Sequence, residues 1–143
     1  MKSKRLIAIV VVIINVLVSI SSALAISIQD EKKLGREFQK VMHRYFVLIE
    51  DPVITGYVEQ IGNKLLHVIP TQPFDYNFYV VKEEVYNASA FPAGHIFINS
   101  GLLSDLQSED ELAGILAHEI AHVVSRHISQ RIEKSKKIDL ATL

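Results

Sequence analysis

Two histidines and a glutamate stand at the middle of an apolar run near the end of the sequence. The run from Leu112 to Val124 reads LAGILAHEIAHVV and contains the pattern HExxH as His118, Glu119 and His122. On a helix of about 3.6 residues per turn, His122 lies about 40° and Glu119 about 100° around the axis from His118. The three polar groups therefore share one face. Burying each without a partner costs roughly 1–3 kcal/mol, and a bound cation removes much of that cost.

This spacing predicts a zinc site. Two imidazoles one helical turn apart can both direct a ring nitrogen at Zn²⁺, and the glutamate after the first histidine lies where it can take a proton from water. We predict His118 and His122 as metal ligands for one Zn²⁺ per chain, with Glu119 as the catalytic general base. The alternative is a pair of core histidines that hydrogen-bond to carbonyl groups, with a glutamate at the surface.

The other histidines give weaker signals. At about 3.6 residues per turn, His127 lies about 180° around the helix axis from His118, which favours packing or hydrogen bonding over metal binding. His95 begins a predicted strand and is interpreted as a surface or structural histidine. His43 and His67 show no ligand pattern.

Extended segments precede the HExxH helix. Apolar and polar residues alternate over residues 74–81, which predicts a half-buried strand. Residues 87–99 read NASAFPAGHIFIN, which predicts a turn between two short strands, arranged as a hairpin or as neighbours in a sheet. A turn at Ser100-Gly101 and a capping box at residues 108–111 then lead into the helix.

Two helices are predicted upstream of the strands. The segment Ser27-Ile28-Gln29-Asp30 begins an amphipathic helix over residues 29–46, and Asp51-Pro52 begins a second. Gly35 and Gly62 lie inside these helices and are interpreted as points of close helix packing.

Composition is typical of one globular domain. The chain has 143 residues, 49% of them hydrophobic, and a formal net charge of −1. That charge gives no reason to expect nucleic acid as a partner. Because the sequence contains no cysteine, it holds no disulfide framework, thiolate metal site or lipid-modified cysteine anchor.

The first 25 residues have the form of a secretory signal peptide. Lys2, Lys4 and Arg5 supply positive charge, residues 6–20 are apolar, and Ala23-Leu24-Ala25 is a small-x-small cleavage pattern. Cleavage after Ala25 is therefore predicted. The alternative is an uncleaved membrane anchor, because a span needs about 20 apolar residues. Either interpretation places the rest of the chain outside the cytoplasm, with 12 of the 15 basic residues, all 16 acidic ones and a formal net charge of −4.

The segment NASAFPAGHIFINSGLL followed by ELAGILAHEIAHVVSRH resembles a known family. It is similar to the HtpX, BepA and Oma-type zinc metallopeptidases, which include the type I CAAX prenyl proteases. The segments EKKLG and DPVITGYVEQIGNKL, together with the N-terminus, resemble the exported bacterial BepA-like branch of that family. The resemblance covers nearly all of residues 29–133.

The resemblance implies an α+β, zincin-like metallopeptidase domain. Residues 26–143 would form its N-terminal part, with helices, a short β-sheet or hairpin and then the HExxH active-site helix. It implies His118 and His122 as zinc ligands and Glu119 as base. It also places four residues along a substrate cleft, where an extended peptide can add to a strand edge: Asn87, Ala88, Ser89 and Ala90.

The implied function is a zinc-dependent metalloendopeptidase of the periplasmic or extracellular space that acts on unfolded or misassembled proteins. Its partners would be polypeptide substrates and no nucleic acid, with membrane association and contact with membrane proteins left open. Family members take a third zinc ligand, a glutamate, from a later helix, and the sequence ends at Leu143 before such a segment. The alternative is a truncated, catalytically inactive exported module that binds polypeptides.

Overall fold

The structure is a computed structural model that describes residues 26–141, with side chains for residues 26–135. The predicted signal peptide, residues 1–25, lies outside the described residues. The elements in chain order are α2 (Ile28–Val41), the 3-10 turn η1 (Met42–Arg44), β1 (Leu48–Ile49), α3 (Pro52–Leu66), β2 (Asn77–Val81), β3 (Ala88–Phe91), the 3-10 turn η2 (Pro92–Gly94), β4 (His95–Asn99), α4 (Ser100–Asp105), α5 (Glu109–Val124) and α6 (His127–Ala141). This arrangement confirms the predicted α+β class.

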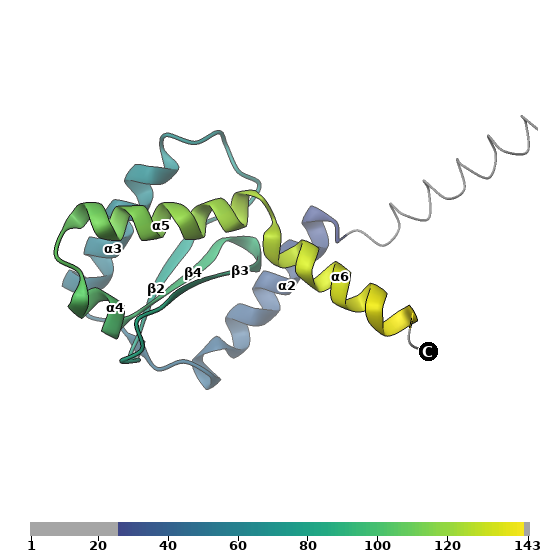
Figure 1. Ribbon diagram of the computed structural model, residues 1–143, viewed down its shortest axis with the longest axis horizontal. Helices are drawn as coiled ribbons and strands as arrows, with labels where there is room; N and C mark the ends of the chain where they lie inside the picture. Colours follow the sequence, from purple (N-terminus) through teal and green to yellow (C-terminus); the bar gives the residue numbers. More distant parts are fainter. Residues whose placement is uncertain (1–25, 142–143) are drawn as a thin grey trace, which may run out of the picture.

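The four strands form one mixed sheet in the order β1-β2-β4-β3. β1 pairs antiparallel with β2, β2 pairs parallel with β4, and β4 pairs antiparallel with β3. The predicted hairpin is confirmed, because β3 and β4 are joined by η2, where Ala93 has a φ of 62° and Gly94 a φ of 90°. β3 is thereby an edge strand that runs beside α5 (Figure 1).

Helices cover both faces of the sheet. Alternate strand residues Phe78, Val80, Ile96 and Ile98 join one core with α3 and α5, whereas Phe97 and Val81 join a second core beneath α2 and η1. In this second core, the rings of Phe38 and Phe91 stack with centroids 4.6 Å apart. The strand predicted over residues 74–81 is shorter than expected, because β2 spans only Asn77–Val81. It is also covered on both faces rather than half-buried, because aromatic residues around α2 cover the second face of the sheet.

The predicted helix starts are confirmed. The Ser27 side chain accepts a hydrogen bond from the Asp30 N–H at 3.1 Å, and the Asp51 side chain accepts one from the Val53 N–H at 2.8 Å. The first helix ends earlier than predicted, at Val41, because the chain tightens into η1 and then turns to pair β1 with β2.

Glycine allows two close approaches between helices and the rest of the fold. A Cβ on Gly62 would overlap the ring of Phe78, and a Cβ on Gly35 would overlap the Cβ atom of Ala93. A Cβ on Gly56, in contrast, would meet no atom within 4 Å. The packing role predicted for Gly35 and Gly62 is confirmed. Among the described residues, no helix combines the length and apolar character needed to cross a membrane.

Candidate metal centre

The helix α5 is fixed by its start and by one apolar face. The Ser108 hydroxyl accepts a hydrogen bond from the Glu111 N–H at 3.3 Å. The Glu111 carboxylate accepts one from Gln107 N–H at 2.9 Å, one residue before the position expected for a capping box. The residues that anchor the helix on the sheet recur at helical spacing: Leu112, Leu116, Ile120 and Val123. This packing fixes how α5 is rotated about its axis relative to the sheet, and therefore which way the HExxH residues face.

The structure brings the three HExxH residues together. The Nε2 atoms of His118 and His122 lie 3.0 Å apart, and their rings are nearly perpendicular at 88°. A carboxylate oxygen of Glu119 completes a group whose ligand atoms all lie within 4.8 Å of one another. His118 is exposed and His122 half-buried, while Glu119 is only 9% exposed. The two histidines thus open toward solvent, whereas the Glu119 side chain is covered.

The donor set and its spacing suit zinc. Histidine nitrogens bind Zn²⁺ at about 2.0–2.1 Å in tetrahedral geometry, which separates two such nitrogens by roughly 3.3 Å. The observed 3.0 Å between the two Nε2 atoms requires only a small adjustment of the rings. Imidazole nitrogen and carboxylate oxygen are both ordinary zinc ligands.

His127 lies closer to the site than predicted. Helix α5 ends at Val124, Arg126 has a φ of 52°, and α6 begins at His127. The resulting corner places His127 Nδ1 at 2.9 Å from His122 Nδ1. The expected position about 180° away was wrong because it assumed an unbroken helix, whereas the expected hydrogen-bonding role is confirmed.

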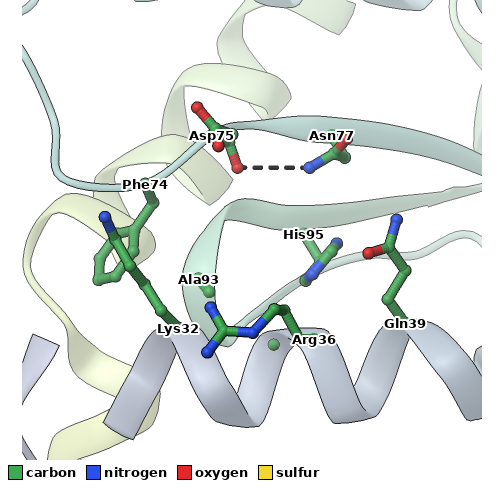
Figure 2. A pocket seen from close by; sticks show the side chains of 9 residues that line it. Lys32, Arg36, Gln39, Phe74, Asp75, Asn77, Ala93 and His95 are labelled. Carbon is green, nitrogen blue, oxygen red and sulfur yellow. Dashed lines mark hydrogen bonds between the residues drawn. The ribbon is translucent and has the colours of Figure 1, made fainter. Parts of the chain in front are cut away.

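His95 is a structural residue on the other face of the sheet. It borders a polar hollow of about 320 Å³ between α2, the start of β2 and the η2 turn (Figure 2). The Tyr79 hydroxyl lies 3.1 Å from His95 Nδ1. Burial lowers the pKa of His95, and a hydrogen bond with the Gly35 backbone partly opposes this effect. His95 and the HExxH residues lie on opposite faces of the sheet. His95 is therefore a structural histidine outside the HExxH group, in agreement with its interpretation from the sequence.

The predicted substrate segment lies beside helix α5. Ala88, Ser89 and Ala90 are in β3, and Asn87 directly precedes it, with its carbonyl accepting a hydrogen bond from Asn99 N–H at 3.0 Å. β3 pairs with β4 on one side, and within residues 26–141 no further strand pairs with its outer edge. Because α5 packs against β3, the open strand edge and the HExxH residues belong to one region of the molecule.

Sequence reasoning missed a buried ion pair at the end of α5. Glu31 is 1% exposed, and its carboxylate lies 2.8 Å from Nε of Arg126. The available signal was the position of Glu31, four residues before Gly35 on the packed side of α2, which is an unusual place for an unpaired acid. Both residues also fall in segments that carry the family resemblance.

A helix-borne HExxH group beside an edge strand has the composition of a metallopeptidase centre. The chain belongs to peptidase family M48, whose sequence profile matches residues 52–143. This confirms the family resemblance drawn from the strand and helix segments.

Three curated proteins illustrate the relationship. The beta-barrel assembly-enhancing protease of Yersinia pestis is 33% identical over 118 residues, which cover 82% of this chain and 24% of that protein. The beta-barrel assembly-enhancing protease of Escherichia coli (strain K12) is 28% identical over 117 residues, with coverage of 82% and 24%. The mitochondrial metalloendopeptidase OMA1 of Schizosaccharomyces pombe is 28% identical over 116 residues, with coverage of 79% and 34%. The chain therefore spans about a quarter to a third of the length of these relatives.

Proposed function

We propose that this chain carries the metal-binding and proton-transfer residues of a zincin-like, zinc-dependent metalloendopeptidase. The observation that carries the proposal is the grouping of the His118 and His122 Nε2 atoms, 3.0 Å apart, with the Glu119 carboxylate in a chain of peptidase family M48. His118 and His122 are the protein ligands in this proposal. A catalytic zinc site commonly has a third protein ligand, which the described residues do not identify.

Glu119 moves the proton in this reaction. Zinc held by the two histidines would supply Lewis-acid activation of water and of the scissile carbonyl. The carboxylate of Glu119 accepts a proton from the attacking water and then delivers it to the leaving amine. Because Glu119 is only 9% exposed, its side chain is largely shielded from bulk water.

The unpaired outer edge of β3 is the observation that favours a polypeptide as the substrate. An extended peptide can form backbone hydrogen bonds with a free strand edge whatever its side chains are, which suits unfolded proteins of varied sequence. We assign Asn87, Ala88, Ser89 and Ala90 to this edge, and misassembled exported proteins to the substrate class. The names of the bacterial relatives refer to β-barrel assembly, which supports β-barrel proteins or the proteins that assemble them as substrates or partners.

Metal removal tests the activity. The full-length gene product that contains this chain should hydrolyse a permanently unfolded polypeptide, lose that hydrolysis with a zinc chelator, and regain it when Zn²⁺ is added back. Hydrolysis is measured as the release of new amino groups, with binding of the same polypeptide measured in parallel. Binding without hydrolysis in the zinc-loaded protein would instead show a non-catalytic polypeptide-binding module.

Export is the second part of the proposal. The positively charged start, the apolar run and the Ala23-Leu24-Ala25 pattern support removal of residues 1–25. N-terminal sequencing of the exported protein should begin at Ile26. A chain that retains Met1 and stays with the membrane would establish the anchored alternative.

A further inference from the structure

The corner between α5 and α6 is held by residues from the other end of the chain. Arg126 donates from Nε to Glu31 Oε2 at 2.8 Å and from its terminal guanidinium nitrogen to the Ile26 carbonyl at 2.6 Å. The second oxygen of Glu31 accepts a hydrogen bond from Ala93 N–H at 3.4 Å, and Ile26 N–H donates to Glu133 at 2.6 Å. Figure 1 shows the start of α2 beside the start of α6. One arginine thus ties α2 to this corner.

Arg126 has a backbone conformation that requires support. Its φ of 52° lies in the left-handed region, which non-glycine residues rarely occupy unless their surroundings fix them. The partner Glu31 is 1% exposed, so the charge of this carboxylate is compensated mainly by Arg126. The ion pair therefore stabilises the left-handed corner at the position where α5 must end.

The corner determines what His127 can contact. His127 Nδ1 lies 2.9 Å from His122 Nδ1, while the other nitrogen of His122, Nε2, faces His118 Nε2 at 3.0 Å. A hydrogen bond between two Nδ1 atoms needs one proton, carried by either ring. If His127 accepts the hydrogen bond, the proton is on His122 Nδ1 and the Nε2 atom of His122 has a free lone pair. If His127 donates the hydrogen bond, neutral His122 has its proton on Nε2 and cannot bind a metal through that atom.

We propose that the Glu31–Arg126 ion pair positions His127 as a hydrogen-bond acceptor that fixes His122 in the tautomer able to bind metal through Nε2. Histidine ligands generally donate their second N–H to a partner that fixes ring orientation and tautomer. Here a histidine takes the place usually held by a carboxylate or carbonyl group. The inference rests on the proposed function only in assigning His122 as a zinc ligand. Arg126 and His127 are positioning residues because they act through His122.

The test compares two substitutions of His127. His127→Asn places an amide oxygen near the position of Nδ1 and keeps an acceptor, whereas His127→Phe keeps a ring and removes the acceptor. Long-range ¹H–¹⁵N NMR of the metal-free protein, at a fixed pH where the imidazoles are neutral, reports the tautomer of His122 directly. We expect Nδ1–H on His122 in the wild type and in His127→Asn, and a mixture or the Nε2–H form in His127→Phe.

Zinc affinity provides the second readout. Loss of such an outer hydrogen-bond partner costs about 10–100-fold in metal affinity, so a competition titration should show this loss in His127→Phe and recovery of most of it in His127→Asn. Glu31→Gln should also weaken zinc binding, by about tenfold. The matched control is Glu37→Gln on the same helix, whose carboxylate pairs with Lys40 at the exposed surface. Thermal unfolding identifies the variants that remain folded.

The outcomes separate this inference from the proposed function. Unchanged His122 tautomer and zinc affinity in folded His127→Phe would overturn the positioning role, even if the protein is a zinc peptidase. A protein that binds no zinc, yet whose His122 tautomer changes in His127→Phe and is retained in His127→Asn, would refute the metal assignment and uphold the positioning role. Weakened zinc binding with His127→Asn no better than His127→Phe would overturn the acceptor role.

Discussion

The substitution Glu119→Gln should lower turnover of an unfolded polypeptide by about 10²–10⁴-fold or more, since that is the range that general base catalysis typically contributes. The amide keeps the shape of the side chain but cannot accept the proton of the attacking water. Zinc content should stay at the wild-type level, since this proposal takes the two ligands from His118 and His122, whose Nε2 atoms are 3.0 Å apart. Hydrolysis and bound zinc are measured on the same full-length preparations.

Asp110→Asn is the matched control for this experiment. Asp110 lies on the same helix, α5, is exposed, and is replaced by the same change from carboxylate to amide. Turnover should stay within about twofold of the wild type because general base catalysis by Glu119 is untouched. Wild-type turnover in Glu119→Gln would refute the assignment of the base. Loss of zinc in that variant would show instead that Glu119 is a ligand.

Removal of either helix histidine is expected to abolish zinc binding. His118→Ala or His122→Ala leaves one imidazole as the remaining proposed ligand, which falls well short of the three protein ligands of a catalytic zinc site. The loss of affinity should exceed the roughly 10–100-fold that an outer hydrogen-bond partner contributes. Zinc binding is measured by calorimetric titration, and hydrolysis should disappear with the metal.

His43→Ala controls for the general effect of losing a histidine. His43 is exposed in η1, which packs with α2 on the opposite face of the sheet from α5. Zinc binding should be unchanged in this variant. Stoichiometric, tight binding that survives His122→Ala would rule out the proposed ligand pair.

Local sequence signals predicted the parts of the fold that depend on neighbouring residues. Ser27, Asp51 and Ser108 each cap a helix, because a side-chain oxygen can satisfy the free N–H groups one turn ahead. The grouping of HExxH followed in the same way from helical spacing alone. The hairpin of β3 and β4 required only the turn residues between them.

Features that depend on distant partners were not predictable from one sequence. The parallel pairing of β2 with β4 skips β3, and the two-residue strand β1 exists only because β2 provides a partner. The break between α5 and α6 was missed because Arg126, with a φ of 52°, has no local sequence signal for a left-handed residue. Its support comes from Glu31, which is 95 residues away along the chain.

The hydrogen bond from Ile26 N–H to Glu133 would change in strength if the chain is cleaved after Ala25, as proposed. In the uncut chain this nitrogen belongs to the peptide bond after Ala25, and it lies 2.6 Å from the Glu133 carboxylate. Cleavage after Ala25, as proposed, would turn the same nitrogen into a charged α-ammonium group. Charge-assisted hydrogen bonds are roughly twice as strong as neutral ones. Because Ile26 also contacts Arg126, signal removal would then strengthen the corner beside His127 only after the chain has been exported.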